Sequence, residues 1–198
     1  MLIVTDGSKI GGKVGAALSI WKGDTETKTR KLALSNYCTV YQAELLALCV
    51  ATTEVKKSKS KSFGVYSDSM SALQTITNYD SPHPLAVEAR QNIKASFLHG
   101  KAVTLHWIKA HAGLKGNERA DGLAKEAAEN SRKRPDYDRC PISFVKRSLR
   151  MTTLEEWNRR YTSGETASVT KLFFPDALVA YVIAEKEYSP SNILHHKS

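Results

Sequence analysis

Four carboxylates occupy matched positions in this sequence, two just after strand-like segments and two near the starts of helix-like segments. Asp6 and Asp68 follow apolar runs that are typical of buried strands. Glu44 and Asp121 fall in the first turns of segments whose apolar residues have helical spacing. Strand ends and adjoining helix starts meet at the carboxyl edge of an open α/β sheet. We therefore expect the four side chains to converge.

Four converging negative charges require compensation. Two carboxylates about 4 Å apart repel each other by roughly 4 kcal/mol at an effective dielectric constant near 20. Mg²⁺ or Mn²⁺, which take oxygen ligands, would replace this repulsion with attraction. A pair of such ions roughly 3.5–4 Å apart can activate a water molecule and stabilise the leaving oxygen of a phosphodiester. The carboxylates thus indicate metal-dependent phosphodiester hydrolysis.

Each carboxylate also has an ordinary structural explanation when it is considered alone. Asp6 before Gly7 is typical of a turn, and Glu44 suits the positive end of a helix dipole. Asp68 suits a helix N-cap, and Asp121 suits the exposed face of a helix. Only their joint placement favours a shared site.

The segments that must position these residues follow the order βββαβααβα. The expected strands are Leu2–Thr5, Val14–Trp21, Thr27–Ser35, Phe63–Tyr66 and Lys101–Ile108, and the expected helices are Tyr41–Val55, Met70–Thr77, Leu85–His99 and Asn117–Glu129. The first three strands are close enough to form an antiparallel meander. The later strands need helical crossovers and hence parallel pairing, so the sequence predicts an α/β domain.

The composition changes after Asn130. The segment SRKRPDYDRCP mixes charges with two prolines and is typical of a linker. Ile142–Tyr161 has the composition of a helix, and Thr162–Ser198 is expected to be irregular. We therefore divide the chain into a domain of residues 1–130 and a basic linker and tail of residues 131–198.

The net charge of +9 over 198 residues favours a polyanionic partner, and nucleic acid ahead of a membrane surface. Ordinary solubility is an equally good explanation of charge alone. Three cysteines without a CxxC pair indicate neither a disulfide framework nor a zinc site, and they favour a reducing, intracellular compartment. No run approaches the roughly 18 apolar residues of a membrane span, and the opening MLIVTDGS lacks the features of a signal peptide.

Sequence motifs surround all four carboxylates. They are TDGS at Thr5–Ser8, YQAELLAL at Tyr41–Leu48, YSDSMSAL at Tyr66–Leu73 and WIKAHAGLKGNERADGLAKEA at Trp107–Ala127. In this order and at this approximate spacing they resemble the four motifs of type 1 ribonuclease H. The resemblance implies a ribonuclease H-like fold with a five-stranded mixed sheet of order 3-2-1-4-5 flanked by helices. It also implies an endonuclease that hydrolyses the RNA strand of RNA–DNA hybrids.

The resemblance further implies roles for individual residues. The family's catalytic acids carry over to Asp6, Glu44, Asp68 and Asp121, which would bind two Mg²⁺ ions, with Mn²⁺ as a substitute. His111, in the loop HAGLKG, matches a mobile-loop histidine that moves protons or assists product departure. The substrate-binding positions carry over to Gly7, Ser8, Thr39, Gln42 and Asn117, with Thr39 near a DNA phosphate. Gly7 would also let a nucleic-acid backbone come close.

Two departures from the family pattern concern the grip on the substrate. Val40 and Tyr41 stand where many cellular members have asparagines, so Tyr41 either stacks on a sugar or packs within the protein. The link NYDSPHP is too short for the basic, Trp-containing protrusion of several cellular enzymes. The grip would then come from the tail, from a neighbouring domain or from the lysines of KKSKSKS, which are otherwise a solvated loop.

The segment EEWNRRYTSGETASVTKLFFP, Glu155–Pro175, resembles the sequence that follows the ribonuclease H domain in LINE-type (non-LTR) retrotransposon polyproteins of insects. This resemblance implies an upstream reverse transcriptase domain, and Met1 lies close enough to the first strand for the chain to be part of a longer one. The expected protein is a monomer without a membrane partner. The alternatives are a DNA nuclease or integrase relative, a catalytically silent nucleic-acid-binding module of a polyprotein, and a cellular ribonuclease H.

Overall fold

Eleven helices and strands occur in the computed structural model, which describes residues 1–110, 113–130, 134–164, 168–176, 179 and 181. The strands are β1 Leu2–Ile10, β2 Lys13–Lys22, β3 Thr25–Leu34, β4 Ser62–Ser67 and β5 Ala102–Trp107. The helices are α1 Val40–Lys57, α2 Met70–Thr77, α3 Pro84–Leu98, α4 Lys115–Glu129, α5 Ile142–Ser163 and α6 Ser168–Phe173. The chain forms two compact units, Met1–Pro141 and Ile142–Ser198.

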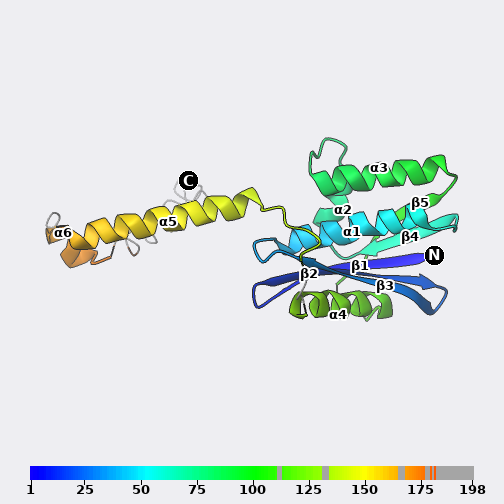
Figure 1. The fold of residues 1–198 in the computed structure, drawn as a ribbon, viewed down its shortest axis with the longest axis horizontal. Helices are drawn as coiled ribbons and strands as arrows, with labels where there is room; N and C mark the ends of the chain where they lie inside the picture. Colours follow the sequence, from blue (N-terminus) through cyan, green and yellow to red (C-terminus); the bar gives the residue numbers. More distant parts are fainter. Residues whose placement is uncertain (111–112, 131–133, 165–167, 177–178, 180, 182–198) are drawn as a thin grey trace, which may run out of the picture. The chain divides into compact units, whose positions relative to one another are not determined.

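The first unit is a five-stranded mixed sheet between helices. Its strand order is β3-β2-β1-β4-β5, with antiparallel pairing among the first three strands and parallel pairing of β4 with β1 and β5. Figure 1 shows α1 and α3 on one side of this sheet and α4 on the other. The element order βββαβααβα and the sheet order predicted from the sequence are both confirmed.

Apolar contacts hold the two helical layers against the sheet. The larger core cluster lies on the α1 side and includes Ile3, Leu18, Leu45 and Val65. On the α4 side, a Cβ atom added to Gly15 of β2 would lie 2.4 Å from both the carbonyl oxygen of Ala124 and the amide nitrogen of Ala128. The helix α4 therefore approaches β2 closely at this point, because Gly15 has no side chain and the residues of α4 that face it are alanines.

Strand β1 is longer than the sequence predicted. Its parallel pairing with β4 covers Leu2 to Thr5, but its antiparallel pairing with β2 continues as far as Ile10. The expectation that the strand ends at Asp6 is therefore wrong, because the β1–β2 hairpin holds the chain extended beyond the apolar run that begins the strand. Asp6 lies within the strand and is the first residue past the ladder that β1 forms with β4.

A buried lysine fixes the end of α1. The ammonium group of Lys101 donates hydrogen bonds to the carbonyl oxygens of Val55 at 2.9 Å, Lys56 at 2.7 Å and Ser58 at 2.6 Å. The last carbonyls of a helix have no partner within the helix, so this side chain supplies one. Lys101 thereby ties the residue before β5 to the C-terminus of α1.

The residues that follow α4 return to the edge of the sheet. The amide of Asp136 donates to the carbonyl of Ala33 at 2.8 Å, and the side chain of Asp136 accepts a hydrogen bond from the amide of Ala33 at 2.8 Å. The carbonyl of Tyr137 accepts from the amide of Ser35 at 3.0 Å. This segment, within the region expected to be a linker, thus pairs with the outer edge of β3.

The second unit contains α5 and α6. The helix expected over Ile142–Tyr161 is confirmed, with its end two residues later at Ser163. The short helix α6 corrects the expectation of an irregular chain after Thr162. None of the helices in the described parts of the chain is long and apolar enough to cross a membrane.

Candidate active site

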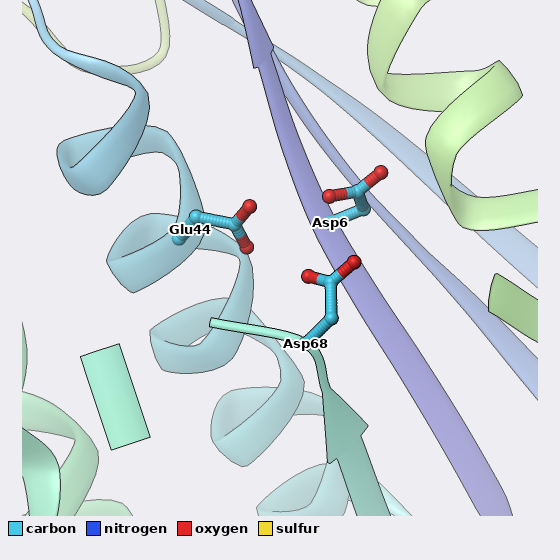
Figure 2. Close-up of side chains that lie close together, drawn as sticks. All are labelled: Asp6, Glu44 and Asp68. Atoms are coloured by element: carbon cyan, nitrogen blue, oxygen red, sulfur yellow. The ribbon is translucent and has the colours of Figure 1, made fainter. Parts of the chain in front are cut away.

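Three of the four predicted carboxylates lie together at one edge of the sheet. Oxygen atoms of Asp6, Glu44 and Asp68 all lie within 4.8 Å of one another. Figure 2 shows the three side chains pointing toward a common space from β1, from α1 and from the residue that follows β4. The sequence therefore identified three groups that the fold brings within reach of one cation.

Gly7 allows α1 to lie against β1 at this point. A Cβ atom on Gly7 would lie 2.6 Å from the amide nitrogen of Glu44 and 2.9 Å from the Cβ of Ala43. The glycine therefore brings Glu44 to the side chain of Asp6. The Gly7 amide also donates to Oδ1 of Asp6 at 2.8 Å, which fixes the orientation of that carboxylate.

Gly7→Ala should destabilise the protein and disturb the carboxylate cluster. The methyl group would force the start of α1 away from β1, and overpacking of this kind costs typically 1–3 kcal/mol. We expect an unfolding free energy lower by about 2 kcal/mol in chemical denaturation, together with a weaker rise of the melting temperature on addition of Mg²⁺.

Gly122→Ala is the matched control, since a Cβ on this helical glycine would meet nothing within 4 Å. It should leave stability unchanged or raise it by about 0.5–1 kcal/mol. Equal behaviour of the two variants would contradict the positioning role of Gly7.

Asp68 is held by two neighbours, one from the end of β5 and one from α4. Nδ2 of Asn117 lies 3.4 Å from Oδ2 of Asp68, and Nε1 of Trp107 donates to the Asp68 carbonyl oxygen at 3.0 Å. Asn117 is buried, and its Oδ1 has no hydrogen-bond partner among the described residues. Trp107 was missed as a site residue, although it opens the motif that contains Asn117.

Burial and mutual repulsion shift the proton affinities of the cluster. Burial, followed by the negative charges of Asp6 and Asp68, raises the pKa of Glu44 to about 9. Burial and the charge of Asp68 raise the pKa of Asp6 to about 6. Asp6 and Glu44 are only 6% and 7% exposed, so water does little to stabilise their charges. Without a cation, Glu44 therefore keeps its proton at neutral pH.

The cluster fits a hard divalent cation. All of its donors are carboxylate oxygens, and Oε2 of Glu44 is buried without a hydrogen-bond partner in the described part of the chain. Oxygen ligands of this type suit Mg²⁺ and Mn²⁺ rather than Zn²⁺, which favours nitrogen and sulfur. A cation here would supply the partner that Glu44 lacks and remove the repulsion that raises both pKa values.

Asp121 lies near the cluster but is not within it. Its carboxylate accepts a hydrogen bond from Nζ of Lys125, one turn later on α4, at 2.7 Å. Its charge contributes to the raised pKa of Asp6, as the weakest of the causes. The hydrogen bond to Asp121 and the charge of Asp121 also raise the pKa of Lys125. The structure thus places Asp121 beside the other acids with a lysine as its partner.

The other predicted site residues have varied positions. His111 lies outside the described residues. Ser8 is half-buried and pairs with Gly15 of β2. Thr39 is the N-cap of α1 and forms a capping box with Gln42, whose Nε2 also donates to the carbonyl of Arg139 at 3.1 Å. The side chain of Gln42 is therefore engaged within the protein, a role that the sequence did not predict.

Tyr41 packs within the protein in this structure. Its hydroxyl oxygen lies 2.6 Å from Oγ1 of Thr75 on α2. Its ring meets that of His83 edge-on, with the centroids 6.1 Å apart. Of the two interpretations left open by the sequence, these contacts support packing.

Comparisons with known proteins agree with the fold and indicate the family. Residues 1–129 match the family model described as RNase H. The chain is 32% identical over 146 residues to "Ribonuclease H" of Bradyrhizobium diazoefficiens, covering 66% of this chain and 90% of that protein. It is 28% identical over 145 residues to "Ribonuclease H1" of Rattus norvegicus, covering 66% of this chain and 51% of that protein. The chain thus spans about half the length of the rat relative.

A solved structure has the same fold over the same region. The crystal structure of LC11-RNase H1 in complex with RNA/DNA hybrid superposes with a TM-score of 0.52 at 20% sequence identity. The match covers 67% of this chain and 99% of that chain. At this identity the likeness concerns the fold alone.

Proposed function

Because this chain belongs to the RNase H family through residues 1–129, we propose that it is an endonuclease that hydrolyses the RNA strand of RNA–DNA hybrids. Cleavage would depend on divalent cations and would leave 3′-hydroxyl and 5′-phosphate ends. The observation that carries the proposal is the cluster of Asp6, Glu44 and Asp68 at the edge of the sheet. Three buried or half-buried carboxylates so close together are unfavourable unless a cation binds them.

Each residue of the site has a defined task under this proposal. Asp6, Glu44 and Asp68 would hold the cation, and Asp121 would join Asp6 in holding a second one. Bound divalent cations would supply a polarised water molecule and compensate the charge on the leaving oxygen. Glu44 would release its proton on cation binding, because metal ligands must be deprotonated. The family resemblance gives His111 the transfer of a proton or assistance to product departure.

Substrate recognition is proposed to follow the family positions. Hybrid binding needs contacts to both backbones and a test for the 2′-hydroxyl groups that distinguish RNA from DNA. Gly7 and Ser8, on β1 beside Asp6, would face the RNA strand, and Thr39 would lie near a DNA phosphate. Asn117 would act partly through Asp68, since its amide lies against that carboxylate.

The biological setting is proposed from the second unit. The segment Glu155–Pro175, which includes the end of α5 and all of α6, resembles the sequence downstream of the ribonuclease H domain in LINE-type retrotransposons. The enzyme would then remove template RNA from the first DNA strand during reverse transcription. A reverse-transcriptase sequence immediately upstream in the parent reading frame would support this setting, and an unrelated upstream sequence would contradict it.

A labelled hybrid provides the direct test of the activity. With millimolar Mg²⁺, the chain should cut end-labelled RNA annealed to DNA and should leave single-stranded RNA, duplex RNA and duplex DNA intact. The products should carry 5′-phosphates, which a phosphatase-sensitive mobility shift detects. Intact RNA in the hybrid would overturn the proposal, and hybrid binding without cleavage would favour a silent binding module. Cleavage of duplex DNA would favour a DNA nuclease on the same fold.

A further inference from the structure

The fourth carboxylate of the site is paired with a lysine of its own helix. Asp121 and Lys125 are four residues apart on α4, and Nζ of Lys125 lies 2.7 Å from Oδ2 of Asp121. The side chain of Lys125 is 47% exposed and that of Asp121 is 24% exposed. The three other acids form their own group within 4.8 Å, to which Asp121 does not belong in the described residues.

The lysine lies close enough to the cluster to affect it. Its ammonium group interacts electrostatically with Asp6 as well as with Asp121. Asp121 in turn interacts with Asp6, so the three charges form one connected set. The ammonium group of Lys125 thus neutralises the Asp121 carboxylate, which a divalent cation would otherwise bind as a ligand.

We propose that Lys125 is a positioning residue that holds the Asp121 carboxylate apart from the three-acid cluster and competes with the divalent cation for it. The inference deepens the proposed function, since it rests on Asp121 being a cation ligand. Lys125 then determines the divalent-cation concentration at which Asp121 becomes a ligand.

The strength of this competition follows from exposure. Solvent-exposed ion pairs contribute little to stability, so a divalent cation can displace the ammonium group from Asp121 without a large cost. A fully buried Asp121–Lys125 pair would prevent cation binding by Asp121, whereas the observed, partly exposed pair only weakens it. Removing the ammonium should therefore tighten cation binding by a small factor, about 2–5-fold.

The test measures cation binding directly and needs no substrate. Mn²⁺ is titrated into the full chain and its free concentration is followed by electron paramagnetic resonance, with the Mg²⁺-induced rise of melting temperature as a second readout. Lys125→Gln should lower the apparent Mn²⁺ dissociation constant by about 2–5-fold. Lys125→Arg, which keeps the charge and can keep the pair, should behave as the wild type does.

Lys31→Gln is the matched control. Lys31 pairs with Glu126 of the same helix at 3.1 Å, with side chains that are 50% and 47% exposed. This variant loses the same charge and a similar ion pair without touching Asp121, and its Mn²⁺ affinity should stay at the wild-type value. Equal tightening in Lys125→Gln and Lys31→Gln would overturn the proposal, because net charge alone would then explain it.

A double-mutant cycle distinguishes the direct contact between Lys125 and Asp121 from a general effect of the lysine's charge on the site. In an Asp121→Asn background, Lys125→Gln should no longer change the Mn²⁺ affinity, because the competition acts through that carboxylate. Undiminished tightening in this background would overturn the proposal while leaving the proposed function intact. If the wild-type chain binds no Mn²⁺, the proposed function fails as well, and the hybrid assay reports that failure independently.

Discussion

Asp68→Asn should lower the rate of hybrid cleavage by at least about 1,000-fold while leaving the fold unchanged. Charge stabilisation by a bound cation contributes several kcal/mol to such a reaction, and each 1.4 kcal/mol corresponds to a factor of ten in rate. The asparagine has the size of the aspartate but offers a cation no negative charge. The backbone hydrogen bond from Trp107 to the Asp68 carbonyl does not depend on the side chain and should persist.

Single-turnover kinetics with a labelled hybrid measure this effect, and circular dichroism and thermal melting check the fold. Asp80→Asn is the matched control, because Asp80 is an exposed acid in the link between α2 and α3. It should cleave at the wild-type rate. Undiminished cleavage by Asp68→Asn would remove the carboxylate cluster from the mechanism.

The second large effect concerns the stability of the cation-free protein. Burial and the neighbouring charges raise the folded-state pKa of Glu44 to about 9, whereas its ordinary value is 4.5. The folded protein therefore binds more protons than the unfolded chain between these two values, and its stability falls as the pH rises through this range. The stabilising effect of low pH is fully present below about 4.5 and is lost by about 9. Asp6, with a pKa of about 6, adds to the fall in the lower part of the range.

Glu44→Gln removes the carboxyl group that must take up a proton when the cation-free chain folds, and it should remove most of this pH dependence. With a chelator present at pH 8, the variant should melt at least about 5 °C higher than the wild type, since roughly 2–4 °C accompany each kcal/mol in a chain of this size. Asp6→Asn should also melt higher without cations. Millimolar Mg²⁺ should raise the melting temperature of the wild type far more than that of Glu44→Gln, because binding to the folded state stabilises it.

Glu129→Gln, at the exposed end of α4, is the control for loss of a negative charge. Thermal melts from pH 5 to pH 9, with and without Mg²⁺, compare all four proteins. If wild type and Glu44→Gln follow the same pH curve, the carboxylates do not share a site.

The sequence predicted the order of the elements because each carries a periodic pattern of its own. It did not predict the length of β1, since GSKI after Asp6 lacks apolar alternation and is extended only by pairing with β2. Local patterns contain no information on such pairing. The same limit hid the short helix α6, in which Lys171 donates a hydrogen bond to the carbonyl oxygen of Gly164.

The carboxylates of the site could be predicted from the sequence, but the residues that position the surrounding elements could not. Gly7 contacts a helix that begins more than thirty residues later, and nothing near it in the sequence signals that approach. Lys101 bonds to carbonyls at least 43 residues earlier, which no spacing rule indicates. The pairing of Asp121 with Lys125 was visible in ADGLAK, because residues four apart on a helix are neighbours. Whether that carboxylate turned to the lysine or to the other acids depended on the fold.

The return of residues 136–139 to the edge of β3 sets a limit on how far the chain can be shortened. The family match ends at residue 129, yet a protein cut there would lose the partners of the Ala33 and Ser35 amides and of the Gln42 side chain. Exposed strand edges with unpaired amides invite pairing with other chains and hence aggregation. A soluble, well-behaved fragment should therefore extend at least to Pro141, twelve residues beyond the point that homology alone suggests.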